Sequence, residues 1–167
     1  MRRQRLILIV LIIVAALQAM YYYPLLPRTV ASHFDGAGHP NGYSSKEEFI
    51  VIYLLVMLAM SFLFFLFSFP MKYLPDAFIN LPKKDYWLAP ARRKETLLFL
   101  AEKMLVFGNA TILFLIVTFQ LAFEANLGGH FSSGTMMLLL GCYLFFTAIW
   151  LIRLIVRFYK TDGSLKD

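Results

Sequence analysis

The chain has 167 residues, of which 60% are hydrophobic and only 16% are charged. A soluble domain of this size has about 45–50% apolar and roughly 25% charged residues, so one water-soluble core cannot hold this excess. The net charge of +6 first suggests a nucleic-acid partner. However, the basic residues flank apolar runs and form no stripe with interleaved aromatic residues, so no nucleic acid is expected.

The apolar residues fall into four long runs, which are predicted to be membrane-spanning helices of one domain that covers residues 1–167. The runs lie at residues 6–22, 49–69, 104–123 and 135–158. A helix rises about 1.5 Å per residue, so a run such as 49–69 covers roughly the 30 Å thickness of the hydrocarbon core. The predicted fold is all-α, an integral membrane bundle of four transmembrane helices in up-down-up-down order.

The basic residues predict the orientation of this bundle. The N-terminus, the 70–103 connection and the C-terminal end from Arg153 together hold fourteen Lys and Arg residues, whereas the loops 23–48 and 124–134 hold two. Because short cytoplasmic segments are enriched in Lys and Arg, both termini and the 70–103 connection are predicted to be cytoplasmic. The two poorly charged loops are predicted to face outward.

The connection at 70–103 is predicted to be amphipathic. Its second part, 91–103, mixes charged and large apolar residues. This pattern predicts a segment that lies along the membrane surface before the helix turns inward.

Polar side chains within the spans are few. Asn109 is predicted to lie near the bilayer midplane and to form an interhelical hydrogen bond. No Asp, Glu, Lys or His occupies the centre of any span, which argues against pumps, channels and most transporters. A small transporter formed by oligomerisation stays open, with Asn109, Thr111 and Thr118 lining a pathway.

The first outer loop carries most of the remaining information. It begins with two prolines, Pro24 and Pro27, and continues through repeated turn signals at Asp35-Gly36, Gly38 and Asn41-Gly42. Ser44 or Ser45 is expected to cap the helix that follows. A loop with this many turns is predicted to be folded.

The same loop is similar to a known family. The matching residues are Pro24, Leu26-Pro27, Val30, His33-Phe34, Gly38, Pro40, Gly42 and Ser45-Lys46. This pattern resembles the bacterial membrane domain of unknown function numbered 1648, which also forms the N-terminal part of immunity proteins against the Sdp toxin. The run Asn80 to Pro90 resembles a segment of stand-alone members. The resemblance implies a multi-pass protein of the bacterial cytoplasmic (inner) membrane.

Two surfaces are candidates for binding a partner. On the outer loop, His33, Phe34, Gly38 and Lys46 are predicted to bind a ligand, an external peptide or another membrane protein. On the cytoplasmic side, Asn80, Asp85 and Trp87 could form a second docking surface. The alternative is that this segment only contacts lipid headgroups, because Trp and Lys are common at that level.

The three histidines all fall on the predicted outer segments. With Asp35, the residues His33, His39 and His130 could form an external site for zinc or copper, which accept nitrogen and oxygen ligands. The alternative is that His33 holds the loop by hydrogen bonds while His39 and His130 are solvated. The single cysteine, Cys142, provides no cysteine-based metal site.

No catalytic constellation is present in the sequence, so no enzymatic activity and no cofactor are expected. The favoured hypothesis is an accessory, sensing or protective (immunity-like) protein whose folded outer loop recognises a ligand or partner in the bilayer. The alternatives are an external metal-binding module, or subunit of a membrane complex, and the small oligomeric transporter.

Overall fold

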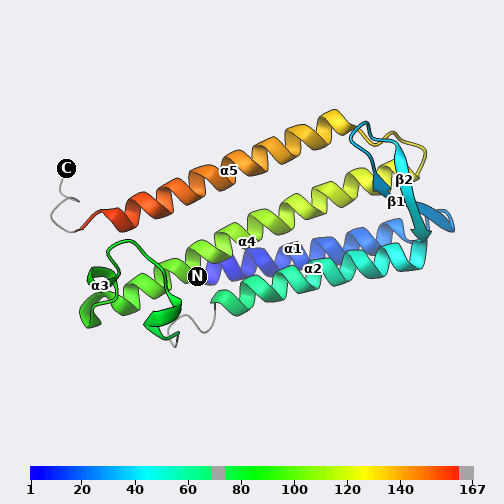
Figure 1. The fold of residues 1–167 in the computed structure, drawn as a ribbon. Helices are drawn as coiled ribbons and strands as arrows, with labels where there is room; N and C mark the ends of the chain where they lie inside the picture. The colour runs from blue at the N-terminus through cyan, green and yellow to red at the C-terminus, as the bar shows by residue number, and fades with distance from the viewer. Residues whose placement is uncertain (69–73, 162–167) are drawn as a thin grey trace.

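The computed structural model describes residues 1–68 and 74–161. Within these ranges, four helices are long and apolar enough to cross a membrane, as predicted. They are α1 (Arg2–Tyr22), α2 (Lys46–Ser68), α4 (Pro90–Asn126) and α5 (Ser133–Tyr159). They lie roughly side by side and alternate in direction, and the start of α1 and the end of α5 both point away from the connections α1–α2 and α4–α5 (Figure 1).

The first connection is not helical, which corrects the all-α prediction. It forms a β-hairpin of β1 (Thr29–Phe34) and β2 (Pro40–Ser45). The strands pair antiparallel from Thr29 opposite Ser45 to Phe34 opposite Pro40, with irregularities around His33. The strands are short and of mixed polarity, so the sequence shows the turn between them more clearly than their pairing. We call this end of the molecule the hairpin end.

Helix α2 begins at Lys46, three residues before the predicted start at residue 49. The Ser45 hydroxyl accepts the Glu48 N–H at 3.2 Å, and the Glu48 carboxylate accepts the Ser45 N–H at 3.1 Å. This reciprocal capping box pairs two backbone donors at the start of the helix. It confirms Ser45, of the two candidate serines, as the cap. The predicted end of this span, residue 69, lies outside the described residues.

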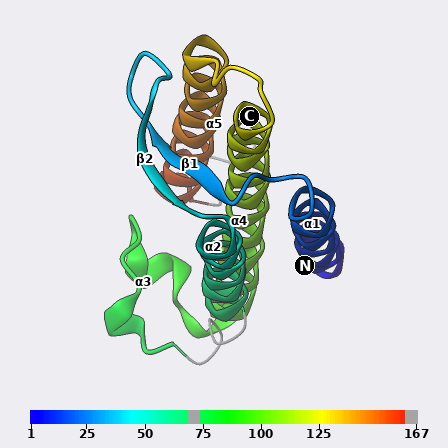
Figure 2. The ribbon, with the colours of Figure 1, turned by 90° about the vertical axis from the view of Figure 1, so that its right-hand side faces the viewer.

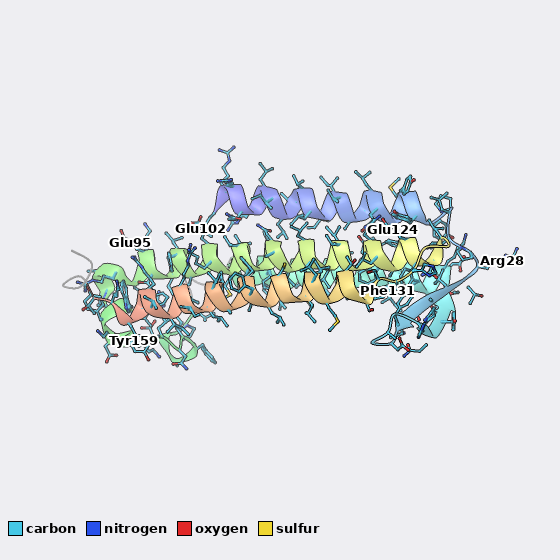
Figure 3. The ribbon with its side chains drawn as sticks, turned by 90° about the horizontal axis from the view of Figure 1, so that it is seen from above. Arg28, Glu95, Glu102, Glu124, Phe131 and Tyr159 are labelled. Carbon is cyan, nitrogen blue, oxygen red and sulfur yellow. The ribbon has the colours of Figure 1, made fainter. Side chains whose placement is uncertain are left out.

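Helix α4 shows that the predicted surface segment at 91–103 is wrong. This segment is continuous with the span in one helix of 37 residues. It contains no Gly or Pro, and its apolar residues Leu97 and Leu100 are buried by the rest of the chain. At about 1.5 Å per residue the helix is roughly 55 Å long. It therefore extends past the start of α1, as Glu95 shows in Figure 3.

The length of α4 also determines which part of α1 Asn109 contacts. Its amide donates to the backbone and side-chain oxygens of Gln4, at 3.0 Å each. The interhelical bond was predicted, but Asn109 lies beside the first turn of α1 and not halfway along it. The reason is that α4 continues beyond α1, so that the middle of α4 is level with the start of its neighbour.

The main apolar core lies between α1, α2 and α4, beneath β1. Tyr53, Leu105, Ile112 and Phe123 are fully buried there. Helix α5 packs chiefly against α4, on the side away from α1 (Figure 2).

A second cluster of buried apolar residues lies at the end opposite the hairpin. It joins the short helix α3 (Lys84–Trp87) to the start of α4 and the end of α5. A 3-10 turn, η2 (Asp76–Phe78), precedes α3.

Candidate functional site

The side chain of Asn126 fastens the β-hairpin to α4. Its Oδ1 accepts the Ala31 N–H at 2.7 Å, and its Nδ2 donates to the Ala31 carbonyl at 3.0 Å and to the Ala122 carbonyl at 2.9 Å. The side-chain amide thus binds β1 as a neighbouring strand would, through one donor and one acceptor. This contact fixes the height and direction of the hairpin above the helices.

The tip of the hairpin is fastened to the loop between α4 and α5. The rings of Phe34 and Phe131 stack with centroids 4.3 Å apart and planes inclined by 13°. Gly38 has a φ of +87°, and a Cβ there would collide with the Phe131 carbonyl. Only glycine fits this position without strain. The hairpin therefore bridges from α2 and α4 to the start of α5.

A groove of about 410 Å³ lies beneath this bridge, and we call it the hairpin groove. Its volume is within the range of about 300–1,000 Å³ that is usual for ligand sites. The lining residues come from the hairpin, the three helices α2, α4 and α5, and the α4–α5 loop: Ser32, His33, Phe34, Asp35, Gly36, Phe49, Thr118, Phe119, Ala122, Phe131 and Met136.

The interior of the hairpin groove is apolar and its rim is polar. Phe49, Phe119 and Met136 line it from three helices. The Thr118 hydroxyl donates back to the Phe114 carbonyl at 2.9 Å, so it is already engaged. The groove can therefore accept the apolar groups of a ligand. Polar groups of the same ligand would find hydrogen-bonding partners only at its edge.

The structure separates the four residues predicted to bind a partner on the outer loop. His33 and Phe34 line the hairpin groove, whereas Gly38 is in the turn, against the Phe131 carbonyl, and is not among the lining residues. Lys46 is at the base of the hairpin, where its ammonium lies 4.7 Å from the centroid of the Tyr23 ring. His33 and Phe34 can touch the same ligand, and Lys46 belongs to another part of the surface.

The predicted metal ligands are not brought together. The His39 ring and the Asp35 carboxylate are 3.5 Å apart, but the His33 ring contacts the Ser32 hydroxyl at 3.2 Å. His130 is exposed on the α4–α5 loop. Across residues 1–68 and 74–161, no three His, Cys, Asp or Glu residues are grouped so as to hold a metal ion. The geometry of the described residues gives the metal hypothesis no site.

Asp35 has a different role, because it organises the turn of the hairpin. One of its oxygens accepts the N–H groups of both Ala37 and His39 at 2.9 Å. The N–H of His39, first, and that of Ala37 hold the pKa of this carboxyl below its usual value of 3.8. The turn is therefore strengthened by the charged form of Asp35.

A chain of hydrogen bonds links the helices just below the hairpin. The buried Tyr53 hydroxyl donates to Gln18 at 2.5 Å, and the Gln18 amide donates to Gln120 at 2.7 Å. Gln120 in turn donates to the Tyr22 hydroxyl and to the Glu124 carboxylate, at 2.6 Å each. These bonds join α1, α2 and α4, because every partner lies on one of these helices. They fix the relative positions of the helices that support the groove.

In the second predicted surface, formed by Asn80, Asp85 and Trp87, the aromatic residue is buried. Trp87 is only 6% exposed, and its indole N–H donates to the Phe158 carbonyl at 2.9 Å. Asn80 and Asp85 remain exposed. Trp87 therefore joins α3 to the end of α5 and offers little surface to a partner or to lipid headgroups.

The residues of the transporter hypothesis point in different directions. Asn109 faces α1, through its bonds to Gln4. Thr111 faces α5, where its hydroxyl lies 2.8 Å from that of Tyr143. Thr118 also lies on the α5 side, near Met136. These side chains occupy two sides of α4, so they line no common pathway through the described helices.

Sequence reasoning missed the residues that hold the hairpin groove together. Asn126 and Phe131 lie at the end of α4 and in the loop after it, about 95 positions from their hairpin partners. A terminal Asn is an ordinary helix-end residue, and nothing local distinguishes it. The contact between Phe34 and Phe131 could be predicted only from related sequences in which both residues change together. Figure 3 shows Phe131 and Glu124 at the same end as Arg28.

The four long apolar helices, arranged as a bundle, indicate a multi-pass membrane protein. Within it, residues 8–60 match the family model described as Domain of unknown function (DUF1648). The match covers most of α1, the whole hairpin and the first part of α2, which includes the loop residues that suggested the resemblance. The run Asn80 to Pro90 lies outside it. No curated protein and no solved structure matches the chain.

Proposed function

We propose that this chain is a non-enzymatic accessory, sensing or protective protein of the bacterial cytoplasmic membrane, and that its hairpin groove binds an apolar segment of a partner membrane protein or peptide. One observation carries the proposal. A hairpin fixed at both ends roofs an apolar groove of about 410 Å³. A fixed roof reduces the ordering cost of binding.

The distribution of charge supports the orientation in this proposal. Within residues 1–68 and 74–161, the basic residues concentrate towards the start of α1 and the end of α5, and the hairpin end has two, Arg28 and Lys46. By the positive-inside rule, the termini face the cytoplasm and the hairpin faces the periplasm. The hairpin groove then lies at the outer interface, where it is open to a partner that is itself in the membrane.

The lining of the groove supports an apolar segment as its ligand. Met136 is flexible and polarizable and fits apolar side chains of various shapes. Phe49 and Phe119 supply flat apolar walls, and Ser32 and His33 at the rim can bond a backbone group of the bound segment. Aromatic anchors with a polar rim are the usual composition of a recognition site.

Site-specific photo-crosslinking in intact membranes tests this proposal. A photoreactive residue at Met136 faces the groove, whereas one at Met137, whose side chain is 72% exposed, is the matched control. We expect one defined protein or peptide to crosslink at Met136 and not at Met137. Thr118→Trp, which fills the groove, is expected to remove this product without lowering the amount of protein in the membrane.

The same assay separates recognition by the groove from recognition by the rest of the loop. Phe34→Ala removes a lining residue, and Lys46→Ala removes a residue at the base of the hairpin. We expect the first to weaken crosslinking and the second to leave it unchanged. If Met136 and Met137 give identical products, or if Thr118→Trp has no effect, the groove is not the binding site.

A further inference from the structure

A second groove lies between α4 and α5 towards the end opposite the hairpin, with a volume of about 330 Å³. Phe99, Phe146 and Trp150 give it apolar walls, and the Trp150 indole N–H is already bonded to the Lys103 carbonyl at 3.3 Å. The same groove is bordered by three cationic side chains, Lys103, Arg153 and Arg157. We call it the α4–α5 groove.

The cations of this groove have no acidic counterpart within it. No Asp or Glu is among the described residues that line it. The Arg157 guanidinium lies over the rings of Phe99 and Trp87, 5.3 and 5.5 Å from their centroids, and the Lys103 ammonium lies 5.1 Å from that of Phe99. These aromatic faces hold the two cations in place without neutralising them. Arg153 is exposed at the same border.

We propose that the α4–α5 groove binds one anionic phospholipid. Its phosphate is held by Arg153, Arg157 and Lys103, and an acyl chain lies along Phe146 and Trp150. The charges indicate the headgroup, since planar guanidinium groups suit phosphate oxygens, and a groove lined by three cations and by no carboxylate favours an anionic lipid over a zwitterionic one. The apolar walls identify the rest of the molecule, because a free phosphate would leave them unused.

The position of the groove along the helices agrees with a lipid. Arg153 and Arg157 lie in the last two turns of α5, where the ends of apolar helices meet the headgroup layer. Two helices with cations at this level form the kind of basic pocket that retains acidic lipids. This inference does not depend on the hairpin groove, which lies at the other end of the molecule.

Quenching of Trp150 fluorescence by brominated lipid tests the inference. The chain has two tryptophans, so the Trp87→Phe variant reports on Trp150 alone. It is reconstituted in phosphatidylcholine vesicles that contain a small fraction of either brominated phosphatidylglycerol or brominated phosphatidylcholine. We expect stronger quenching by the anionic lipid at equal mole fraction.

Charge variants show whether the cations cause this preference. Arg153→Gln is expected to lower the preference for phosphatidylglycerol about fivefold, which corresponds to one lysine or arginine near an anionic surface. The control is Arg2→Gln with Arg3→Gln, which removes two exposed charges at the same end of the molecule but away from the groove. This control should keep the preference.

Native mass spectrometry of the unmodified chain gives a second readout, which does not depend on the Trp87 substitution. We expect one retained phosphatidylglycerol per chain, with retention reduced in Arg153→Gln. Equal quenching by both brominated lipids, or equal retention in Arg153→Gln, would overturn the proposal. Displacement of the lipid by inorganic phosphate would identify a soluble phosphate ligand instead and would also overturn it.

Discussion

The two sides of α4 are packed in different ways. Towards α1 and α2, its residues Leu105 and Ile112 are completely buried, and Gly108 lets the Phe64 ring approach the helix backbone. Towards α5, the contacts are mainly between aromatic rings, such as those of Phe107 and Phe114 with Tyr143, and no residue in the most apolar part of α5 is buried. Three helices form a continuous core, and the fourth is attached to its side.

We infer from this difference that stability and ligand binding depend on different parts of the molecule. The continuous core of α1, α2 and α4 supports the hairpin through Asn126 and the hydrogen bonds around Gln18 and Gln120. Both the hairpin groove and the α4–α5 groove, in contrast, have a wall made by α5. A helix that is joined to its neighbour by a few contacts leaves space between them, and the proposed ligands occupy that space.

The largest contrast is expected when a phenylalanine is removed from each side. Phe123 is fully buried and stacks on Tyr22 with centroids 4.7 Å apart, whereas Phe145 on α5 is 69% exposed. Phe123→Ala should lower the free energy of unfolding in detergent micelles by about 3 kcal/mol, and Phe145→Ala should leave it unchanged. Equal losses in the two variants would show that both sides of α4 are packed alike.

A smaller contrast is expected from adding a side chain to each side. A Cβ at Gly108 would collide with Phe64, whereas a Cβ at Gly141 on α5 would meet nothing within 4 Å. Gly108→Val should destabilise the protein by about 2 kcal/mol through overpacking. Gly141→Val should be neutral or slightly stabilising, because glycine is a poor helix former. Detergent-induced unfolding of both variants, compared in the same micelles, measures the difference.

The connection between the core and the hairpin is tested by Asn126→Ala. The substitution leaves the N–H and the carbonyl of Ala31 without their protein partner and should cost about 1 kcal/mol locally. We expect faster hydrogen exchange at Ala31 with little change in global unfolding. Asn41→Ala, at an exposed position of β2, is the matched control and should preserve the protection of Ala31.

The smallest effect concerns the turn at Asp35. Its pKa is lower in the folded chain, because the charged carboxylate accepts the N–H groups of His39 and Ala37. The resulting stabilisation is fully present above the usual pKa of 3.8 and is lost as the pH falls through the lowered pKa. We expect the NMR signals of the Ala37 and His39 amides to move towards random-coil positions only below about pH 3.8. In Asp35→Ala they should show no such transition.

The sequence allowed the helices to be predicted, because each long apolar run has few structures available to it in a membrane. The helix cap at Ser45 was equally local, since its partner Glu48 is three residues away. The surface segment at 91–103 was mispredicted for the opposite reason. Its apolar face packs against Trp87 and Phe158 and not against lipid headgroups. Phe158 is far away in the sequence, and no local pattern shows that Trp87 is buried against this segment.

The candidate sites were predictable only in part. His33 and Phe34 could be identified as site residues because they belong to a recognisable loop. The helix residues that complete the hairpin groove, such as Phe119 and Met136, look in the sequence like any other apolar residue of a span. Their role depends on where α5 lies relative to α4, which hydrophobicity does not determine.

The amide of Asn126 has one more consequence, for the open edges of the hairpin. A two-stranded sheet normally presents unpaired N–H and carbonyl groups along both of its outer sides and can be extended from either. Because Asn126 occupies those of Ala31, the β1 side is closed at its centre by α4. An additional strand could therefore join only along Pro40–Ser45 of β2, which makes the sheet extensible in a single direction, away from the helix that supports it.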